Sequence, residues 1–217
     1  MSKSTPVTLY VNVIGAVCAL GIGVYFVRSS FEDKSTPRCS STYPAPTQIT
    51  FENDAGQPLS PAELQARSGA QERGMLENAR VVVAEGAPSR SVLEVRVSGT
   101  PDEAGVRSGW QLANLRAARS ACLAYSVWLP DGFQYGNLGL LPGLYAGRKL
   151  DPSERPVQGA GFATRVRWSS EGGGDVVVQA PATPDGQGFS GDAFKLPTGR
   201  WVRVEQEVGL NNPGQAD

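Results

Sequence analysis

Hydrophobic and polar residues alternate along much of the second half of the chain. The segments 91–97 (SVLEVRV) and 161–168 (GFATRVRW) alternate with a period of two residues, which predicts half-buried strands. Clusters rich in Gly, Pro and Asp separate the apolar segments and predict turns. Six or seven short strands in one domain predict an all-β sandwich or jelly roll. The remaining predicted strands span 79–84, 121–129, 175–180 and 200–208.

Weaker patterns precede these strands. Residues 61–69 (PAELQARSG) predict one or two helical turns, and residues 48–52 form a short β-like run. The side chains that we expect to face the core are Leu93, Val95, Val97, Leu123, Tyr125, Val127, Phe162, Val176 and Val178.

A long apolar segment lies near the N-terminus. Residues 7–27 are almost all apolar, and the stretch 4–27 carries no charge. About 20 such residues in a helix span a hydrocarbon core of roughly 30 Å, so the segment predicts one retained transmembrane helix. A cleaved signal peptide is the alternative, but its apolar core would be shorter and an A-x-A-like site would follow it.

The predicted helix divides the chain into four parts. We expect a short tail at 1–6, a transmembrane helix at 7–28, a Pro- and Ser-rich extended tether at 29–47 and a β domain at 48–217. Within the helix, Gly15, Ala19 and Gly23 recur every four residues and form a stripe of small residues. Such stripes allow close helix–helix contact, so other membrane protein subunits and the bilayer are expected partners.

The composition excludes several classes of function. The sequence has no histidine, which excludes Ser-His-Asp and Cys-His nucleophile systems and His-ligated metals. We expect no cofactor and no metal site. The net charge is −1 without long runs of one sign, so no nucleic-acid partner is expected. High Gly and Pro contents, 26 and 16 residues, favour a turn-rich β fold.

Three cysteines are too few for a disulfide scaffold. Cys18 lies in the apolar segment. Cys39 and Cys122 can form a disulfide in an oxidising compartment, or Cys122 can be an ordinary buried thiol in its apolar run.

Three motifs in the second half carry a family resemblance. They are Leu-Pro-Gly-Leu-Tyr at 141–145, Gly-Phe-x-x-Arg at 161–165 and Leu-Asn-x-Pro-Gly at 210–214. With the order of the segments between them, they resemble polysaccharide lyase family 14, the alginate-lyase group. The resemblance begins at about residue 91, covers a little over half of the chain and implies a concanavalin-like jelly-roll sandwich. Family domains continue past the third motif, so we expect further chain or a partner to cover the sheet edge.

The resemblance also implies where a site lies. Family members eliminate across a uronate linkage, which requires a Lys or Tyr for proton transfer and a positive group near the carboxylate. The family residues are a Lys, a Ser, an Arg and two tyrosines, and here only the Arg is retained. The corresponding positions are Leu140, Ala163, Arg165, Val177 and Gln179.

Three functions are compatible with these observations. The first is a non-catalytic accessory subunit of a larger bacterial membrane complex, with photosynthetic or respiratory complexes as hosts by analogy. The second is a carbohydrate-binding module for an acidic uronate polysaccharide, with Tyr135 and Tyr145 stacking on sugars. The third is an active alginate or glucuronan lyase that recruits Tyr145, Arg148 or Lys149.

The location of the domain rests on two opposing arguments. Arg28, Lys34 and Arg38 follow the apolar segment and favour the cytoplasm for the C-terminal side. The family resemblance implies the periplasm, and large domains are translocated largely regardless of flanking charge. We therefore expect a single-pass protein of the bacterial inner membrane with its C-terminal domain in the periplasm.

Overall fold

A computed structural model describes residues 39–68, 72–97, 105–136, 138–147, 161–181 and 194–211. The chain divides into two units, Met1–Thr42 and Tyr43–Asp217. In the first unit only the short helix α2, Cys39–Thr42, is described, and it lies within the segment predicted as an extended tether. The predicted transmembrane segment and its face Gly15, Ala19 and Gly23 lie outside the described residues. Among the residues that are described, no helix is long and apolar enough to cross a membrane.

A small helical and β module begins the second unit. It contains α3 (Pro61–Ser68), α4 (Met75–Asn78) and the antiparallel pair β1 (Ala79–Val82) and β2 (Val92–Val95). The helix predicted at 61–69 and the strands predicted at 79–84 and 91–97 are therefore confirmed, each slightly shorter than expected. The β-like run at 48–52 contributes one isolated bridge, Glu52 to Pro58.

The helix α3 begins with a capping box. The Ser60 backbone N–H donates to Glu63 Oε2 at 2.7 Å, and the Glu63 N–H donates to Ser60 Oγ at 3.3 Å. These two bonds satisfy backbone donors that have no partner inside the helix. The Ser60 side chain also donates to Glu63, which lowers the pKa of that carboxyl group.

The module has its own apolar cluster. Leu59, Leu64, Met75 and Ala79 are buried together, and Leu93 packs against them. The prediction that Val95 and Val97 face the core is wrong, because they are 36% and 46% exposed. In β2, Leu93 packs against this cluster. The alternation of hydrophobic and polar residues continues beyond it, to the exposed Val95 and Val97.

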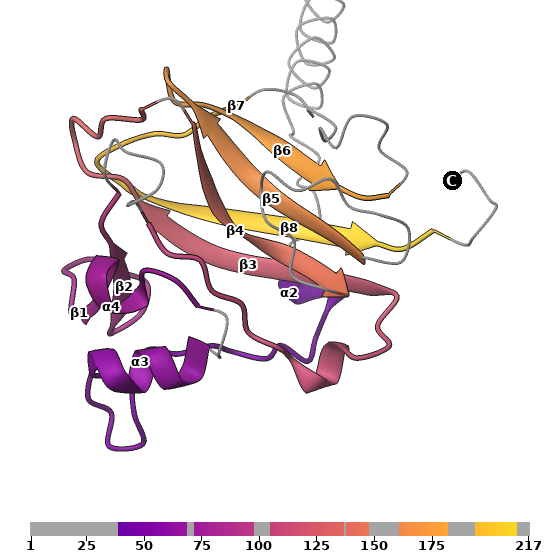
Figure 1. Cartoon of the computed structure of the whole chain (residues 1–217), viewed down its shortest axis with the longest axis horizontal. Helices are drawn as coiled ribbons and strands as arrows, with labels where there is room; N and C mark the ends of the chain where they lie inside the picture. The colour runs from indigo at the N-terminus through magenta and orange to yellow at the C-terminus, as the bar shows by residue number, and fades with distance from the viewer. Residues whose placement is uncertain are drawn as a thin grey trace, which may run out of the picture. The chain divides into compact units, whose positions relative to one another are not determined.

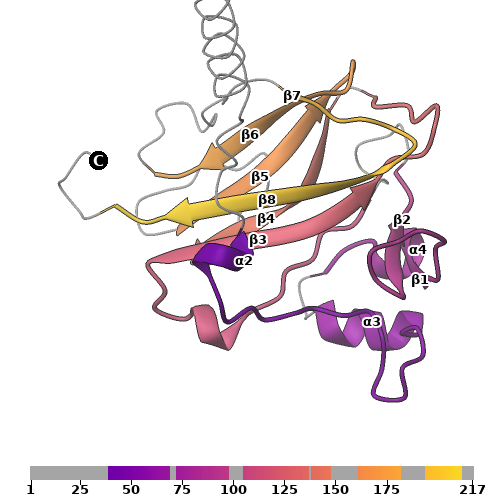
Figure 2. The same cartoon turned by 180° about the vertical axis from the view of Figure 1, so that it is seen from behind.

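Two antiparallel sheets form the larger part of the second unit. One pairs β3 (Ser120–Trp128) with β8 (Trp201–Gly209), and a 3₁₀ turn at Ala113–Leu115 precedes β3. The other has the order β4-β5-β6-β7. Figures 1 and 2 show, from opposite sides, that the β3–β8 pair lies across one face of the four-stranded sheet. The strands of that sheet are β4 (Leu138–Gly147), β5 (Gly161–Ser169), β6 (Gly173–Gln179) and β7 (Phe194–Lys195).

Most of these strands follow the predicted pattern. The strands predicted at 121–129, 161–168, 175–180 and 200–208 correspond to β3, β5, β6 and β8. The sequence did not predict β4, since Gly139, Pro142 and Gly143 interrupt its alternation and a β-bulge lies between Leu140 and Gly143. The two-residue strand β7 was also missed.

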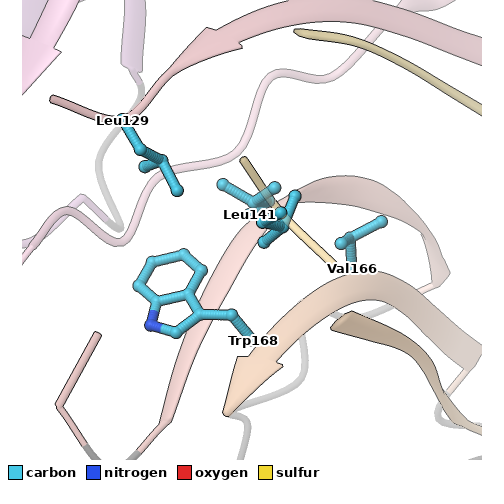
Figure 3. Packing of buried hydrophobic residues seen from close by; sticks show 5 residues of the cluster. Leu129, Leu141, Val166 and Trp168 are labelled. Carbon is cyan, nitrogen blue, oxygen red and sulfur yellow. The ribbon is translucent and has the colours of Figure 1, made fainter. Parts of the chain in front are cut away.

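The main core lies between the two sheets. Its buried cluster contains Trp168 and Val166 of β5 and Leu141 of β4, and Figure 3 shows these side chains converging with Leu129, which follows β3. The indole N–H of Trp168 donates to the Tyr135 carbonyl at 2.9 Å. Tyr125 and Val127 pack on this cluster as predicted, and Leu196 completes it. The other side chains predicted to face inward in this domain, Leu123, Phe162, Val176 and Val178, are half-buried.

Candidate functional site on the outer face of the four-stranded sheet

The strand register brings the five family-site positions to one face of the sheet. Arg165 of β5 is paired with Gly143 of β4 and Val177 of β6, and Ala163 is paired with Tyr145 and Gln179. Residues directly opposite each other in neighbouring strands point to the same face, and alternate residues of a strand share a face. Leu140 belongs to this face too, because it is paired with Arg167, two residues beyond Arg165.

This outer face is opposite to the core face. Val166 and Trp168, which alternate with Arg165 and Arg167 along β5, belong to the buried cluster between the sheets. We refer to the positions Leu140, Ala163, Arg165, Val177 and Gln179 as the outer site.

Arg165 is held in place by a neighbouring carboxamide. Its Nη1 donates to Gln179 Oε1 at 2.6 Å, and Gln179 is only 2% exposed. Ala163 is 1% exposed, and the ring of Tyr145 packs against it. The Tyr145 hydroxyl approaches Gly109, where an added Cβ would lie 2.8 Å from it. Arg165 therefore lies beside an amide, a methyl group and a phenol ring.

A second arginine extends the outer site along β5. Arg167 Nε donates to Asp175 Oδ1 at 2.8 Å, and Nη2 donates to Oδ2 in the same ion pair. The hydrogen bond to Asp175 raises the pKa of Arg167. Sequence reasoning missed this pair, although the alternation of GFATRVRW does place Arg165 and Arg167 on one face. Two hydrogen bonds to the same carboxylate hold the Arg167 guanidinium on Asp175.

The five side chains of the outer site include no group suited to proton transfer. Leu140, Ala163 and Val177 carry only hydrocarbon, and Gln179 has an amide that does not titrate. Arg165 remains protonated at all physiological pH values, so it can hold a carboxylate but cannot act as a base. Tyr145 is the one phenol that the register places directly beside these positions in the described strands.

The two tyrosines predicted to contact sugar are not together. Tyr145 lies on the outer face, whereas Tyr135 packs against the core cluster and donates from its hydroxyl to the Leu196 carbonyl at 2.7 Å. Tyr135 also lines a separate surface cavity of about 610 Å³ with Lys195 and Arg200. Arg148 and Lys149 lie outside the described residues.

The cysteines and the metal prediction concern other parts of the chain. Cys39 and Cys122 are both in the disulfide-bonded state. Their pairing with each other stays a prediction. In the part of the chain that the structure describes, no group of three or more His, Cys, Asp or Glu side chains is placed to hold a metal ion.

Two antiparallel sheets that pack around a shared core form a β-sandwich domain, and this arrangement is consistent with the predicted jelly roll. The model of the polysaccharide lyase 14 family matches residues 94–217, more than half of the chain, and the chain therefore belongs to that family. The crystal structure of the marine PL-14 alginate lyase from Aplysia kurodai is similar in fold, with a TM-score of 0.56 and 20% sequence identity. That match covers 68% of this chain and 65% of the lyase chain. No curated protein matches significantly.

Proposed function

We propose that this chain is a non-catalytic member of the polysaccharide lyase 14 family that acts by contact, as a membrane-anchored accessory subunit of a larger bacterial membrane complex. The observation that carries the proposal is the composition of the outer site. On the face of Arg165, Val177 is directly opposite it, Gln179 is opposite Ala163, and Leu140 is opposite Arg167. None of the four side chains Leu140, Ala163, Val177 and Gln179 can take or give a proton.

Elimination from a uronate polymer requires two proton transfers. A base removes the proton next to the carboxylate, and an acid protonates the leaving sugar oxygen. Positioned acid–base groups typically contribute about 10²–10⁴-fold each to the rate. Leu140, Ala163, Val177 and Gln179 stand where the family has polar groups, and they supply neither term. Within the described strands, Tyr145 is the phenol beside these positions through which an active lyase would work.

The sequence supports the membrane part of the proposal. The charge-free stretch 4–27 is long enough to cross a bilayer, and Gly15, Ala19 and Gly23 would present small residues on one helix face. The disulfide-bonded state of Cys39 and Cys122 is in keeping with an oxidising compartment such as the periplasm. In this proposal the helix packs among those of the host complex, and the β domain contacts the periplasmic surface of the complex.

Co-purification in mild detergent tests the accessory role. Wild-type chain should be recovered with other membrane subunits, and Gly15→Leu with Gly23→Leu should release it while the β domain keeps its melting temperature. Val17→Leu with Val24→Leu is the matched control, since a period of 3.6 residues places these positions on the opposite helix face. Recovery of wild-type chain alone, or equal retention of both double variants, would contradict the proposal.

Uronate binding is the second candidate function, and the placement of Arg165 favours it. Arg165 is half-buried on the outer face and its guanidinium donates to Gln179, so a bound carboxylate would meet a donor group already held in place. Retention on immobilised alginate that is lost in Arg165→Ala would support this function. Binding unchanged by that substitution would exclude Arg165 as the contact.

A further inference from the structure

The space between the two sheets is filled unevenly. At one end, the cluster around Val166 and Trp168 fills it. Toward the other end lies a cavity of about 450 Å³, within the range of roughly 300–1,000 Å³ typical of small-molecule sites. Its lining comes from the inward faces of β5 and β6 and from β8, namely Phe162, Thr164, Val166, Val176, Val178 and 205–209.

The walls of this inter-sheet cavity are mainly apolar. Phe162, Val176 and Val178 come from the four-stranded sheet, and Val208 comes from β8. Phe162, Val176 and Val178 were predicted to face a core, and the structure places them around open space. They are half-buried rather than fully packed. An apolar ligand would remove their remaining surface from water.

One polar side chain in the lining has an unsatisfied atom. Gln206 is 7% exposed, and its Nε2 donates to the buried Thr164 hydroxyl. Its Oε1 is buried without a hydrogen-bond partner. A buried acceptor without a donor is unfavourable, and a ligand hydroxyl can remove that cost. The site thus combines a hydrocarbon wall with one acceptor.

The rim of the cavity carries two carboxylates. Glu205 accepts from Arg203 at 2.6 Å, and Glu207 accepts from the Tyr43 hydroxyl at 2.7 Å. Both residues line the cavity. An anionic head group would be repelled by Glu207 and could not donate to Gln206, whereas a neutral hydroxyl meets neither obstacle.

We infer that the inter-sheet cavity binds an uncharged, largely apolar small molecule with a single hydroxyl group, such as a medium-chain alcohol, whose hydroxyl donates to Gln206 Oε1. The site lies on the core face of β5 and β6, opposite to the outer site with Arg165. It is therefore independent of uronate binding and of the accessory role.

Photolabelling of the full-length protein tests this inference. The probe is a decanol analogue that carries a diazirine, and labelled peptides are identified by mass spectrometry. We expect labelling of peptides that contain Phe162, Val178 or Val208, competed by 1-decanol and more weakly by decane or decanoate. Absence of such labelling, or equal competition by all three compounds, would overturn the inference.

Substitutions separate the cavity from general hydrophobic labelling. Val178→Trp fills the cavity and should abolish labelling of these peptides, whereas Ala124→Trp adds the same ring at an exposed position and should leave it unchanged. Gln206→Leu removes the acceptor and should weaken competition by 1-decanol about fivefold, without affecting decane. If Val178→Trp fails to fold by circular dichroism, the Gln206→Leu result decides alone. Undiminished labelling in a folded Val178→Trp protein, or an unchanged alcohol preference in Gln206→Leu, would contradict the assignment.

Discussion

The glycine of the Leu-Pro-Gly motif allows β4 and β5 to approach closely, and one substitution tests this role. At Gly143, a Cβ atom would lie 1.8 Å from the carbonyl oxygen of Thr164 and 2.9 Å from the Arg165 Cα. Both contacts are with the backbone of β5, so no side-chain rotation can relieve them. Gly143→Ala therefore forces β4 and β5 apart at the point where Arg165 is paired.

The size of the effect follows from the distances. Opening the strands until the Cβ–oxygen contact reaches 3.0 Å requires a shift of about 1.2 Å. A ladder bond of roughly 2.9 Å would then stretch to about 4 Å, beyond hydrogen-bond range. Losing two neighbouring bonds and leaving their groups half-satisfied costs about 2–4 kcal/mol. Against a typical total stability of about 5–15 kcal/mol, this is a large loss.

Urea denaturation followed by tryptophan fluorescence measures this loss. With a typical slope for a domain of this size, the midpoint should fall by about 1–2 M in Gly143→Ala. Gly209→Ala is the control, because an added Cβ in β8 meets nothing within 4 Å. Its stability should change by less than about 0.5 kcal/mol. A Gly143→Ala midpoint equal to that of Gly209→Ala would refute the close approach of β4 and β5.

Three further predictions concern packing, capping and charge. Trp168→Ala should lower the unfolding free energy by about 3–5 kcal/mol in the same urea assay, because the ring is 5% exposed in the core. Ser60→Ala should cost about 1 kcal/mol by loss of the cap on α3. The folded-state pKa of Glu63 is lowered, so the stabilisation by its carboxylate is complete above the unfolded pKa and is lost as the pH falls through the folded value. The melting temperatures of wild type and Glu63→Ala should therefore differ at neutral pH and converge in acid. Asp175→Ala should destabilise by about 1 kcal/mol, because it leaves the partly exposed Arg167 without its carboxylate, and Arg167→Ala combined with it should show coupling in a double-mutant cycle.

Sequence patterns predicted the strands that are half-buried and regular. The alternation in β5 arises because Val166 and Trp168 face the core while Arg165 and Arg167 face outward. In β4 the bulge and its Pro and Gly residues hide the same alternation. The prediction for Val95 and Val97 failed for a different reason. The alternation of hydrophobic and polar residues continues there, although both side chains are exposed.

The five positions of the outer site come from the family resemblance, and their role in a functional site stays a prediction. Strand alternation alone places Ala163 and Arg165 on one face, but their interactions could not be predicted. The hydrogen bond from Arg165 to Gln179 depends on the register between β5 and β6, which sequence spacing does not determine. The sequence could not predict the inter-sheet cavity either, because side chains that alternate correctly can still leave space between two sheets.

The most direct test of the account is an assay for elimination itself. Purified chain is incubated at high concentration with alginate and with glucuronan, and the unsaturated product is followed by ultraviolet absorbance beside an active family lyase. We predict no product above the protein-free blank, because none of Leu140, Ala163, Val177 and Gln179 can act as an acid or base. Turnover in the wild-type chain that disappears in Arg165→Ala or Tyr145→Phe would contradict the central claim and would identify this protein as an active lyase.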